Sequence, residues 1–374
     1  PGAGKILARF LDDAGTNYRI AIENLVYKPG VSPLELVTFE TVKKLKQFVV
    51  TISNQIRKRF KNPKLIKILE FPVLFLGAKP QDTPAFYNFM NHADFVLGTW
   101  YPMGGMFKIV EAMETLALSL GVKIHTESTV EKISTLNGKV QGLIVNDVLM
   151  PSDFVLSGAD YKHTETLLPI NLRSYKESYW QKKIFAPSSL LFYVGFDRKL
   201  SGVLHHMLFF DTDFDAHASD IYDDPKWPKA PLFYASFTSL TDPSVAPKDK
   251  ESGFFLIPLA PDLEDSDIFR EKYFDLILER LEKHTNQSIK PFISFKESYC
   301  INDFKQDYNS YKGNAYGMAN TLFQTAFLRP KIRSKKVDNL YFTGQLTVPG
   351  PGVPPSLISG KIASELILQN THYK

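Results

Sequence analysis

Cysteine and long apolar runs are both scarce in this sequence. Cys300 is the one cysteine among 374 residues, so no disulfide can form within the chain. A reducing compartment fits this composition without being required by it. A membrane-spanning helix needs about 18–20 uninterrupted apolar residues, and the best apolar run, residues 66–78, is broken by Lys67, Glu70 and Pro72. We therefore expect no membrane-spanning helix.

Recognisable sets of metal ligands and acid–base pairs are also missing. The adjacent His205 and His206 are the best candidates, but no other histidine, cysteine or carboxylate stands at ligand spacing around them. Neighbouring strand residues point to opposite faces of a sheet, so we expect no metal site here. A role for one of these histidines as a proton acceptor is left as an alternative, and the sequence assigns no catalytic residue. The other histidines considered are isolated in sequence: His125, His163, His217 and His372.

Neither sign of charge dominates the chain. A formal net charge of +4 gives no argument for nucleic acid as a partner. Apolar residues make up 44% of the chain and aromatic residues 13%, which is a globular composition. The aromatic content suits a large apolar cavity or a lipid-facing surface, as well as a dense core. The length favours two or three domains.

The N-terminal part, from about Leu7 to Asn62, is predicted to be mainly helical. The segment Lys43–Lys67 carries nine lysines and arginines and no acidic residue, and the apolar run Phe71–Leu76 follows it. A basic amphipathic helix beside an apolar loop is typical of a protein lying in a membrane interface. A helical domain with a solvated basic face is the alternative. The residues expected on one helical face are Val42, Leu45, Phe48, Val49, Ile52, Ile56 and Phe60.

The next region alternates helix and strand. Gly104-Gly105 precedes a helix with an apolar face that is predicted to end at Gly121. Asn137-Gly138 is a strong signal for a type I′ hairpin turn. Residues 188–299 are predicted to form an α+β domain on a mostly antiparallel sheet. The strands expected up to there are residues 122–125, 129–133, 140–145 and 154–156, and those in the domain are residues 190–194, 232–234 and 253–257.

The C-terminal segment Asn339–Gly360 is the most informative. A short strand, residues 340–343, leads into a glycine- and proline-rich loop, and a helix is predicted from Pro354 or Pro355 onward. Such a helix start presents unpaired backbone N–H groups and partial positive charge. A tight strand-to-helix turn without a ligand is the simpler alternative.

Several segments together carry a family resemblance, in the expected order and over nearly the whole chain. These are Leu69–Gly77, Gly98–Met106, Tyr311–Gly317, Phe327–Pro330 and Asn339–Gly360. They resemble the phytoene and carotenoid desaturases of bacterial type, relatives of the flavin-dependent amine oxidases. The resemblance implies an α/β fold with a discontinuous Rossmann-like FAD domain, an antiparallel-sheet (α+β) substrate domain and a helical lid.

One part of the family pattern is absent from the sequence. The family's adenosine end rests on an N-terminal βαβ unit with a GxGxxG fingerprint, whereas Gly2-Ala3-Gly4 here has no buried strand before it. We expect that about 100 residues carrying this unit precede Pro1 in the native protein. The domains expected are 1–97 (helical lid and membrane association), 98–165 (FAD domain), 166–330 (substrate domain) and 331–374 (FAD domain).

The resemblance also assigns cofactor-binding positions. It places the backbone of Val130 at the adenine of FAD, and Gly344 and Gln345 at the pyrophosphate and ribitol. Gly352, Val353 and Pro354 would run beside the flavin ring. The helix start after them would favour the reduced flavin, which carries negative charge around N1. Other possible cavity residues, for which structural roles are the simpler interpretation, are Tyr316, Arg329 and Asp303.

The activity implied is FAD-dependent desaturation of a carotenoid, with a hydroxylated or monocyclic carotene at the 3,4 position as the expected substrate. Hydride would pass to the flavin, and oxygen or a quinone would reoxidise it. A cytoplasmic enzyme held peripherally on an anionic membrane surface, the inner face of the cell membrane, is expected. The alternatives are a phytoene-type multi-step desaturase, a flavin amine oxidase, and a non-catalytic membrane-bound carotenoid carrier.

Overall fold

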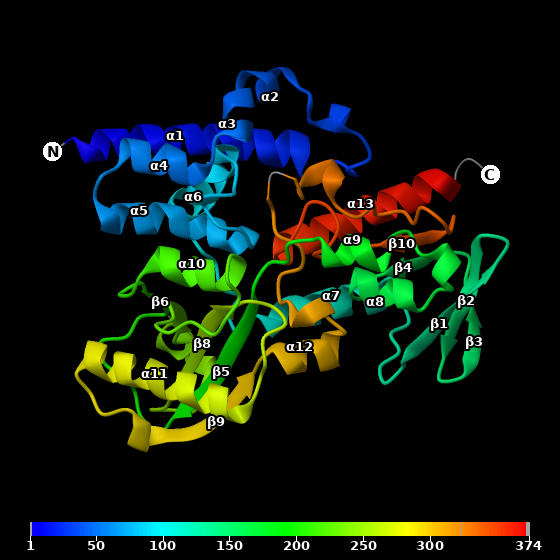
Figure 1. Cartoon of the computed structure of the whole chain (residues 1–374). Helices are drawn as coiled ribbons and strands as arrows, with labels where there is room; N and C mark the ends of the chain where they lie inside the picture. Colours follow the sequence, from blue (N-terminus) through cyan, green and yellow to red (C-terminus); the bar gives the residue numbers. More distant parts are fainter. Residues whose placement is uncertain (1, 322, 372–374) are drawn as a thin grey trace.

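The computed structural model describes residues 2–321 and 323–371, which form three regions (Figure 1). Helices α1–α6, drawn in blue to cyan, make up a helical region. A second region is built on a five-stranded sheet, and a third combines strands β1–β4 and β10 with the long helix α13. The predicted fold class, mixed helix and sheet with an antiparallel substrate sheet, is confirmed. The four domain boundaries stay predictions.

The helical region packs around its own apolar core. The largest cluster there joins α1 to α4 and α5 through Phe10, Ile52, Ile56, Phe60 and Leu69. Its elements are α1 (Ala3–Ile20), η1 (Ala21–Leu25), η2 (Pro33–Leu36), α2 (Phe39–Lys43), α3 (Leu45–Val49), α4 (Ile52–Arg59), α5 (Pro63–Glu70), η3 (Phe71–Leu76), η4 (Ala85–Asn88), α6 (Phe89–His92) and η5 (Ala93–Leu97).

The single helical face expected over residues 42–60 is wrong. The chain is extended at Val50 and Thr51, and the Thr51 side chain caps the new helix α4 by accepting the N–H of Asn54. A β-branched Val-Val-Thr run favours this break, because such side chains fit extended backbone better than a helix. As a result Ile52, Ile56 and Phe60 are buried, whereas Val42, Leu45 and Val49 are each about 60% exposed or more.

Two residues of the basic segment connect the helical region to the sheet region. Arg57 pairs with the buried Glu70 and with Asp215, and Lys67 donates to the carbonyl groups of Phe210 and Thr212. In the apolar run after it, Val73 is completely buried, and the side chains of residues 74–76 lie outside the described part of the structure. Lys58, Arg59, Lys61 and Lys64 stay exposed on this segment. Membrane contact through the basic segment and the apolar run therefore stays a prediction.

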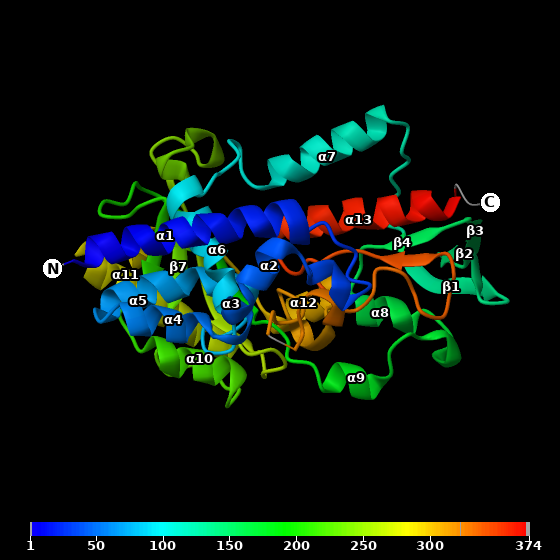
Figure 2. The same cartoon turned by 90° about the horizontal axis from the view of Figure 1, so that it is seen from above.

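Helix α7 (Phe107–Ser119) stands apart from the rest of the molecule, alongside α13 (Figure 2). Gly121 follows it with a positive φ of 82°, as predicted for the residue after a helix end. None of the residues of α7 is buried. Residues 122–125, predicted as a strand, are irregular instead, because a strand needs a neighbouring strand and no described strand pairs with this segment.

A three-stranded antiparallel sheet follows: β1 (Val130–Leu136), β2 (Lys139–Val145) and β3 (Val148–Pro151). The predicted hairpin is confirmed, with Asn137 and Gly138 both at positive φ. Strand β4 (Val155–Ser157) then pairs in parallel with β10 (Leu340–Phe342), which lies almost 200 residues away along the chain. Glycine loops leave both strands, and helix α13 (Val353–Thr371) begins after the second, one residue before the predicted start.

The five-stranded sheet has the order β6-β7-β8-β5-β9 and is antiparallel throughout. Alternate residues of β5 and β8, such as Phe192 and Phe255, pack with helix α11 (Asp267–Thr285) into the main core. The other face of these strands is only partly covered. The strands are β5 (Ser188–Phe196), β6 (His206–Phe209), β7 (Phe233–Ser236), β8 (Glu251–Leu259) and β9 (Ile293–Tyr299).

Short helices connect these strands. Helix α10 lies between the sheet and the helical region in Figure 1. No helix within residues 2–321 and 323–371 combines the length and apolarity that crossing a membrane requires. The remaining elements are α8 (Tyr161–Thr166), η6 (Ile170–Leu172), α9 (Glu177–Gln181), α10 (Phe214–Tyr222), η7 (Thr238–Leu240), η8 (Pro243–Val245), η9 (Lys290–Phe292), α12 (Ile301–Tyr308), η10 (Tyr311–Gly313) and η11 (Ala326–Leu328).

Candidate functional site

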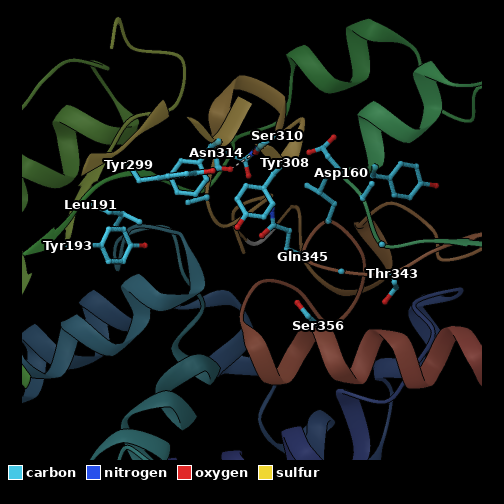
Figure 3. Close-up of a pocket in the computed structure, with 17 residues that line it drawn as sticks. Asp160, Leu191, Tyr193, Tyr299, Tyr308, Ser310, Asn314, Thr343, Gln345 and Ser356 are labelled. Carbon is cyan, nitrogen blue, oxygen red and sulfur yellow. Dashed lines mark hydrogen bonds between the residues drawn. The ribbon is translucent and has the colours of Figure 1, made fainter. Parts of the chain in front are cut away.

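A cavity of about 600 Å³ opens where the parallel strands β4 and β10 end. Gly158 follows β4, Thr343 and Gly344 follow β10, and all three line the cavity together with Ser356 of α13 (Figure 3). Ligands of open α/β sheets bind in the crevice beyond the carboxyl ends of parallel strands. The volume lies in the range of small-molecule and cofactor sites.

The opposite wall of the cavity belongs to the antiparallel sheet. Leu191 and Tyr193 come from β5, and Tyr299 comes from the neighbouring strand β9 (Figure 3). Phe304 and Tyr308 of α12 add two more rings. One side of the cavity is thus backbone-rich and glycine-lined, and the other is aromatic. Such a pair of walls can hold a polar, phosphate-bearing part of a ligand on one side and an apolar part on the other.

The loop after β10 is fixed to α13 by hydrogen bonds. The N–H of Gly344 donates to Ser359 Oγ at 2.8 Å, and Thr343 Oγ1 lies 2.6 Å from the same oxygen. Gly344 has a φ of 98°, a conformation that other residues rarely adopt. This anchoring holds the cavity wall in one position while leaving its backbone open to a ligand.

The start of α13 donates fewer N–H groups than the sequence suggested. The helix begins at Val353, and the next two positions are Pro354 and Pro355, which have no N–H. The first intrahelical bond runs from the N–H of Ser356 to the carbonyl oxygen of Gly352. In the first three positions only Val353 can therefore donate to a ligand, and the positive end of the helix acts mainly through its dipole.

Arg329 is buried directly behind this loop. Its Nη1 donates to the carbonyl oxygen of Gln345 at 3.1 Å, and its Nη2 donates to Met318 O at 2.7 Å and Asn320 Oδ1 at 2.6 Å. Its Nε has no hydrogen-bond partner. Burial lowers the pKa of Arg329 to about 10, so the guanidinium stays charged at neutral pH.

Asp160 is the acidic side chain in the cavity wall. It caps α8 by accepting the N–H of His163 at 3.0 Å, and it also accepts the N–H of Tyr311. Burial raises the pKa of Asp160, and these backbone hydrogen bonds oppose that rise. Asp160 and the aromatic wall were not among the residues predicted from the sequence. No local pattern marks them, because they meet only through the pairing of distant strands.

The fold places some of the predicted cofactor-binding residues at the cavity and others away from it. Gly344 and Gln345 line the cavity. Gly352, Val353 and Pro354 lie at the adjoining start of α13, and a Cβ on Gly352 would have only Pro355 within 4 Å. Val130 is the first residue of β1, as predicted for a strand, but it does not line this cavity. Its proposed contact with adenine stays a prediction.

The histidine pair differs from expectation in its geometry. Strand β6 begins at His206, so His205 precedes it, and the two rings lie 4.3 Å apart instead of on opposite faces. Each Nδ1 lies 2.5 Å from a hydroxyl oxygen, that of Thr241 for His205 and that of Tyr234 for His206. Burial lowers the pKa of His206. Within the described residues no group of three or more potential ligand side chains is placed to hold a metal ion.

The other candidates have structural environments. His217 is buried, accepts the N–H of Leu232 at Nδ1 and lies 2.9 Å from the carbonyl oxygen of Pro258. Asp303 caps α12 and pairs with Arg270 at 2.7 Å. Of the rest, His125 is exposed, His163 lies in α8, and burial raises the pKa of Tyr316, which does not line the cavity. His372 lies outside the described residues.

The cavity fits the flavin end of FAD on three observations. Glycines 344 and 352 leave the backbone uncovered, the positive end of α13 points at the same loop, and the buried cation Arg329 stands behind it. Gly352, Val353 and Pro354 at the start of α13 would run beside the ring system, Gly344 and Gln345 would lie by the pyrophosphate and ribitol, and the aromatic wall would face the ring.

Comparisons with known proteins agree with this geometry. The family model described as "Flavin containing amine oxidoreductase" matches residues 36–368. A carotenoid 3,4-desaturase of Haloarcula japonica is 37% identical over 99% of this chain and 76% of its own length. A 4,4'-diapophytoene desaturase of Staphylococcus haemolyticus is 30% identical over 100% of this chain and 77% of its own.

Solved structures show the same fold at low sequence identity. An oxidoreductase from Methanosarcina mazei superposes with a TM-score of 0.62 at 19% identity, over 88% of this chain and 73% of the other. A putrescine oxidase variant gives a TM-score of 0.59 at 11% identity, over 98% of this chain and 76% of the other. The chain is therefore an FAD-dependent oxidoreductase that belongs to the flavin containing amine oxidoreductases and, within them, to the phytoene and carotenoid desaturase family.

Proposed function

We propose that the protein desaturates a carotenoid, removing two hydrogens from the 3,4 C–C bond of a hydroxylated or monocyclic carotene. The single observation that carries this proposal is the aromatic wall of the cavity, which continues into a partly covered apolar face of the five-stranded sheet. The 37% identity with a carotenoid 3,4-desaturase supports the position of the new double bond.

The sheet face suits a long polyene. Ring centroids lie 5.4 Å apart between Tyr193 and Phe254 and 6.2 Å apart between Phe254 and Tyr234, so the rings form a row across β5, β8 and β7. Leu191 and Leu256 stand beside them, on the face opposite α11. Burying such a ligand here would remove apolar surface of both partners from water, at about 25 cal/mol for each Å².

The chemistry is divided between cofactor and protein. FAD supplies the hydride acceptor, and a proton leaves the neighbouring carbon of the substrate. The residues of this chain position the polyene on the sheet face, exclude water from the C–H bond and hold the loop around Gly344. Asp160 is the one carboxylate among the described residues that line the cavity, and it already accepts the N–H groups of His163 and Tyr311. An ammonium ion therefore has no free carboxylate there, which favours desaturation over amine oxidation.

We further propose a membrane-facing surface over residues 31–49, which overlaps the predicted basic segment at Lys43 and Lys46 and extends it toward the N-terminus. Seven large apolar side chains between residues 31 and 49 are 59–76% exposed, and Lys28, Lys43 and Lys46 lie exposed among them, with Glu40 as an exposed acidic neighbour. An apolar patch with basic side chains binds anionic lipid headgroups. We call it the 31–49 surface; its apolar members are Val31, Leu34, Val37, Phe39, Val42, Leu45 and Val49.

A liposome assay distinguishes the two candidate surfaces. Changing Leu34, Phe39 and Leu45 together to Glu should release the protein from anionic liposomes, because it places charge on the apolar patch. Lys58→Glu and Lys61→Glu, in the original basic segment, should leave binding within about twofold. The reverse result would return the membrane contact to α4 and α5. The same surface would place the enzyme on the cytoplasmic face of the cell membrane, where a membrane quinone or oxygen could accept the electrons.

The function itself is tested by anaerobic reduction of the bound flavin. Addition of about one equivalent of a hydroxylated or monocyclic carotene should remove the absorbance of the oxidised flavin, whereas a small amine should leave it unchanged. Bleaching by an amine alone would establish an amine oxidase. Faster bleaching by an acyclic hydrocarbon carotene would indicate a phytoene-type desaturase, and pigment binding without bleaching would leave the carrier.

A further inference from the structure

Arg329 is the one arginine among the largest fully buried side chains of the described structure, with 2% of its surface exposed. All its hydrogen-bond partners are neutral: two backbone carbonyl oxygens and the amide oxygen of Asn320. No carboxylate within residues 2–321 and 323–371 lies at ion-pair distance from it. The ionisable groups that face it are the phenols of Tyr87 and Tyr179 and the ammonium of Lys183, none of them an anion at neutral pH.

A buried charge without a counter-ion is unusual, because removal of an ion from water is unfavourable unless an opposite charge compensates. Among the described residues some buried charges have an ionic partner and others, such as Glu165, have only hydrogen bonds to neutral groups. Glu70, which is equally buried, accepts two hydrogen bonds from Arg57, at 2.8 and 2.9 Å. Nε of Arg329 has no hydrogen-bond partner, and its charge has no counter-ion among the described residues, so an anion that came close to it would be stabilised.

The position of Arg329 shows where that anion would lie. Its Nη1 holds the carbonyl oxygen of Gln345, and Gln345 lines the cavity. A Cβ on Gly350 would lie 3.2 Å from its Nη2, so the loop toward α13 passes directly over the guanidinium. The guanidinium of Arg329 therefore contacts the backbone of a residue that lines the cavity, and that residue separates the charge from the space expected for the flavin.

Because the start of α13 offers few backbone N–H donors to a negative ligand, the charge of Arg329 can provide stabilisation that the helix start does not. Two of the first three helix positions are Pro354 and Pro355, so the helix start provides few N–H groups to a negative ligand. Hydride transfer from a C–H bond brings two electrons and one proton, and leaves one unit of negative charge on the acceptor. A fixed full charge behind the loop can stabilise that negative charge without moving during the reaction.

We propose that Arg329 is an electrostatic positioning residue, whose buried charge stabilises the anionic reduced form of the bound flavin. It acts through the loop of residues 345–350 and touches no substrate. The inference rests on FAD as the cofactor and not on which carotenoid is used. The experiment therefore needs no substrate, and its failure would leave the proposed desaturation untouched.

The experiment measures the midpoint potential of the flavin bound to the full-length protein, by slow reduction together with a reference dye. Three variants are compared with the wild type: Arg329→Lys, Arg329→Met and Asn320→Asp. Asn320→Asp is the sharpest, because it neutralises the guanidinium in place with a side chain of nearly the same shape. Arg333→Met is the matched control, since Arg333 lies four residues on, is 47% exposed and pairs with Asp338 at 3.5 Å.

Arg329→Met and Asn320→Asp should each make the flavin harder to reduce, by tenfold or more in the equilibrium constant, which is about 30 mV for a two-electron couple. Arg329→Lys and Arg333→Met should change it less than threefold. A potential unchanged in Asn320→Asp would overturn the proposal and leave Arg329 as a purely structural support of the loop.

A second measurement needs no variant, in case the neutral ones do not fold. In the wild-type protein the reduced flavin should keep the absorption spectrum of its anionic form at a pH well below the pKa at which free reduced flavin takes up a proton. A neutral reduced flavin in the wild type would equally overturn the proposal.

Discussion

Gly350→Ala is the substitution that tests the cavity loop most severely. Gly350 has a φ of 136°, and an added Cβ would lie 3.1 Å from Asn320 Nδ2 and 3.2 Å from Arg329 Nη2. The positive φ costs a residue with a side chain roughly 1–2 kcal/mol. Disturbing the hydrogen bond between the guanidinium and Asn320 costs a further 1.5–3 kcal/mol or so.

These two terms together amount to about 2.5–5 kcal/mol. We expect the loop to relieve this strain by moving outward, which opens the cavity wall, so the loss appears as weaker FAD binding. Because about 1.4 kcal/mol corresponds to a factor of ten, the dissociation constant of FAD should rise by about 60-fold or more. Titration of the apoprotein with FAD, followed by flavin fluorescence, measures it, and a thermal melt shows whether the fold survives.

Gly121→Ala separates the two contributions. Gly121 also has a positive φ, of 82°, but a Cβ there would have nothing within 4 Å. The control variant therefore carries the backbone strain alone, at a site far from the loop, and should bind FAD as the wild type does. If Gly350→Ala bound FAD within threefold of Gly121→Ala, the close packing of loop and guanidinium would not matter, and the reasoning would be refuted.

Three further predictions concern the loop, the core and the sheet face. Gly352→Leu should lose most bound FAD, because the leucine side chain would fill the space in which the flavin ring is expected to lie. The sheet region should stay folded, since Pro355 is the only neighbour within 4 Å of the added Cβ. Retention of FAD at wild-type occupancy would place the flavin elsewhere. Burial lowers the pKa of His217 to about 4 in the folded protein, against about 6.5 in the unfolded chain. The unfolded state then binds more protons between these values, so stability should fall by roughly 3 kcal/mol as pH drops from 6.5 to 4; His217→Gln should flatten that slope in urea unfolding, and an identical slope would contradict the assignment. Phe254→Glu, in the row of rings but outside the cavity lining, should abolish carotene binding and spare FAD binding. Ile268→Glu, at an 81% exposed position of α11, should affect neither; equal carotene binding by both variants would exclude the sheet face.

Local chemistry accounts for the parts of the fold that the sequence predicted well. Asn137-Gly138 forms the expected hairpin because its turn type depends on two residues alone. The predicted start of α13 lies within one residue of the observed one for the same reason, since glycines and prolines mark the loop between β10 and α13. The helix over residues 42–60 failed because its spacing matched a helix while Val49, Val50 and Thr51 favoured an extended break.

Long-range pairing accounts for what the sequence could not predict. Leu191 meets Tyr299 across β5 and β9, more than 100 residues apart along the chain, so the aromatic wall of the cavity depends on a register that no local pattern encodes. From the sequence, Arg329 is only a possible cavity residue. Its burial and its lack of an acidic partner among the described residues depend on the tertiary structure, which the sequence pattern does not encode.

The central claim is that this chain desaturates a carotenoid, and product analysis tests it most directly. The full-length protein, supplied with FAD, an electron acceptor and a hydroxylated or monocyclic carotene in liposomes, should yield a product lighter by two hydrogens with a red-shifted absorption band. Both signals must appear together, because a longer conjugated system has a smaller optical gap, whereas isomerisation changes the spectrum without the mass and hydroxylation adds mass. Bound pigment that changes in neither respect, at full FAD occupancy and across cyclic and acyclic carotenes, would contradict the claim.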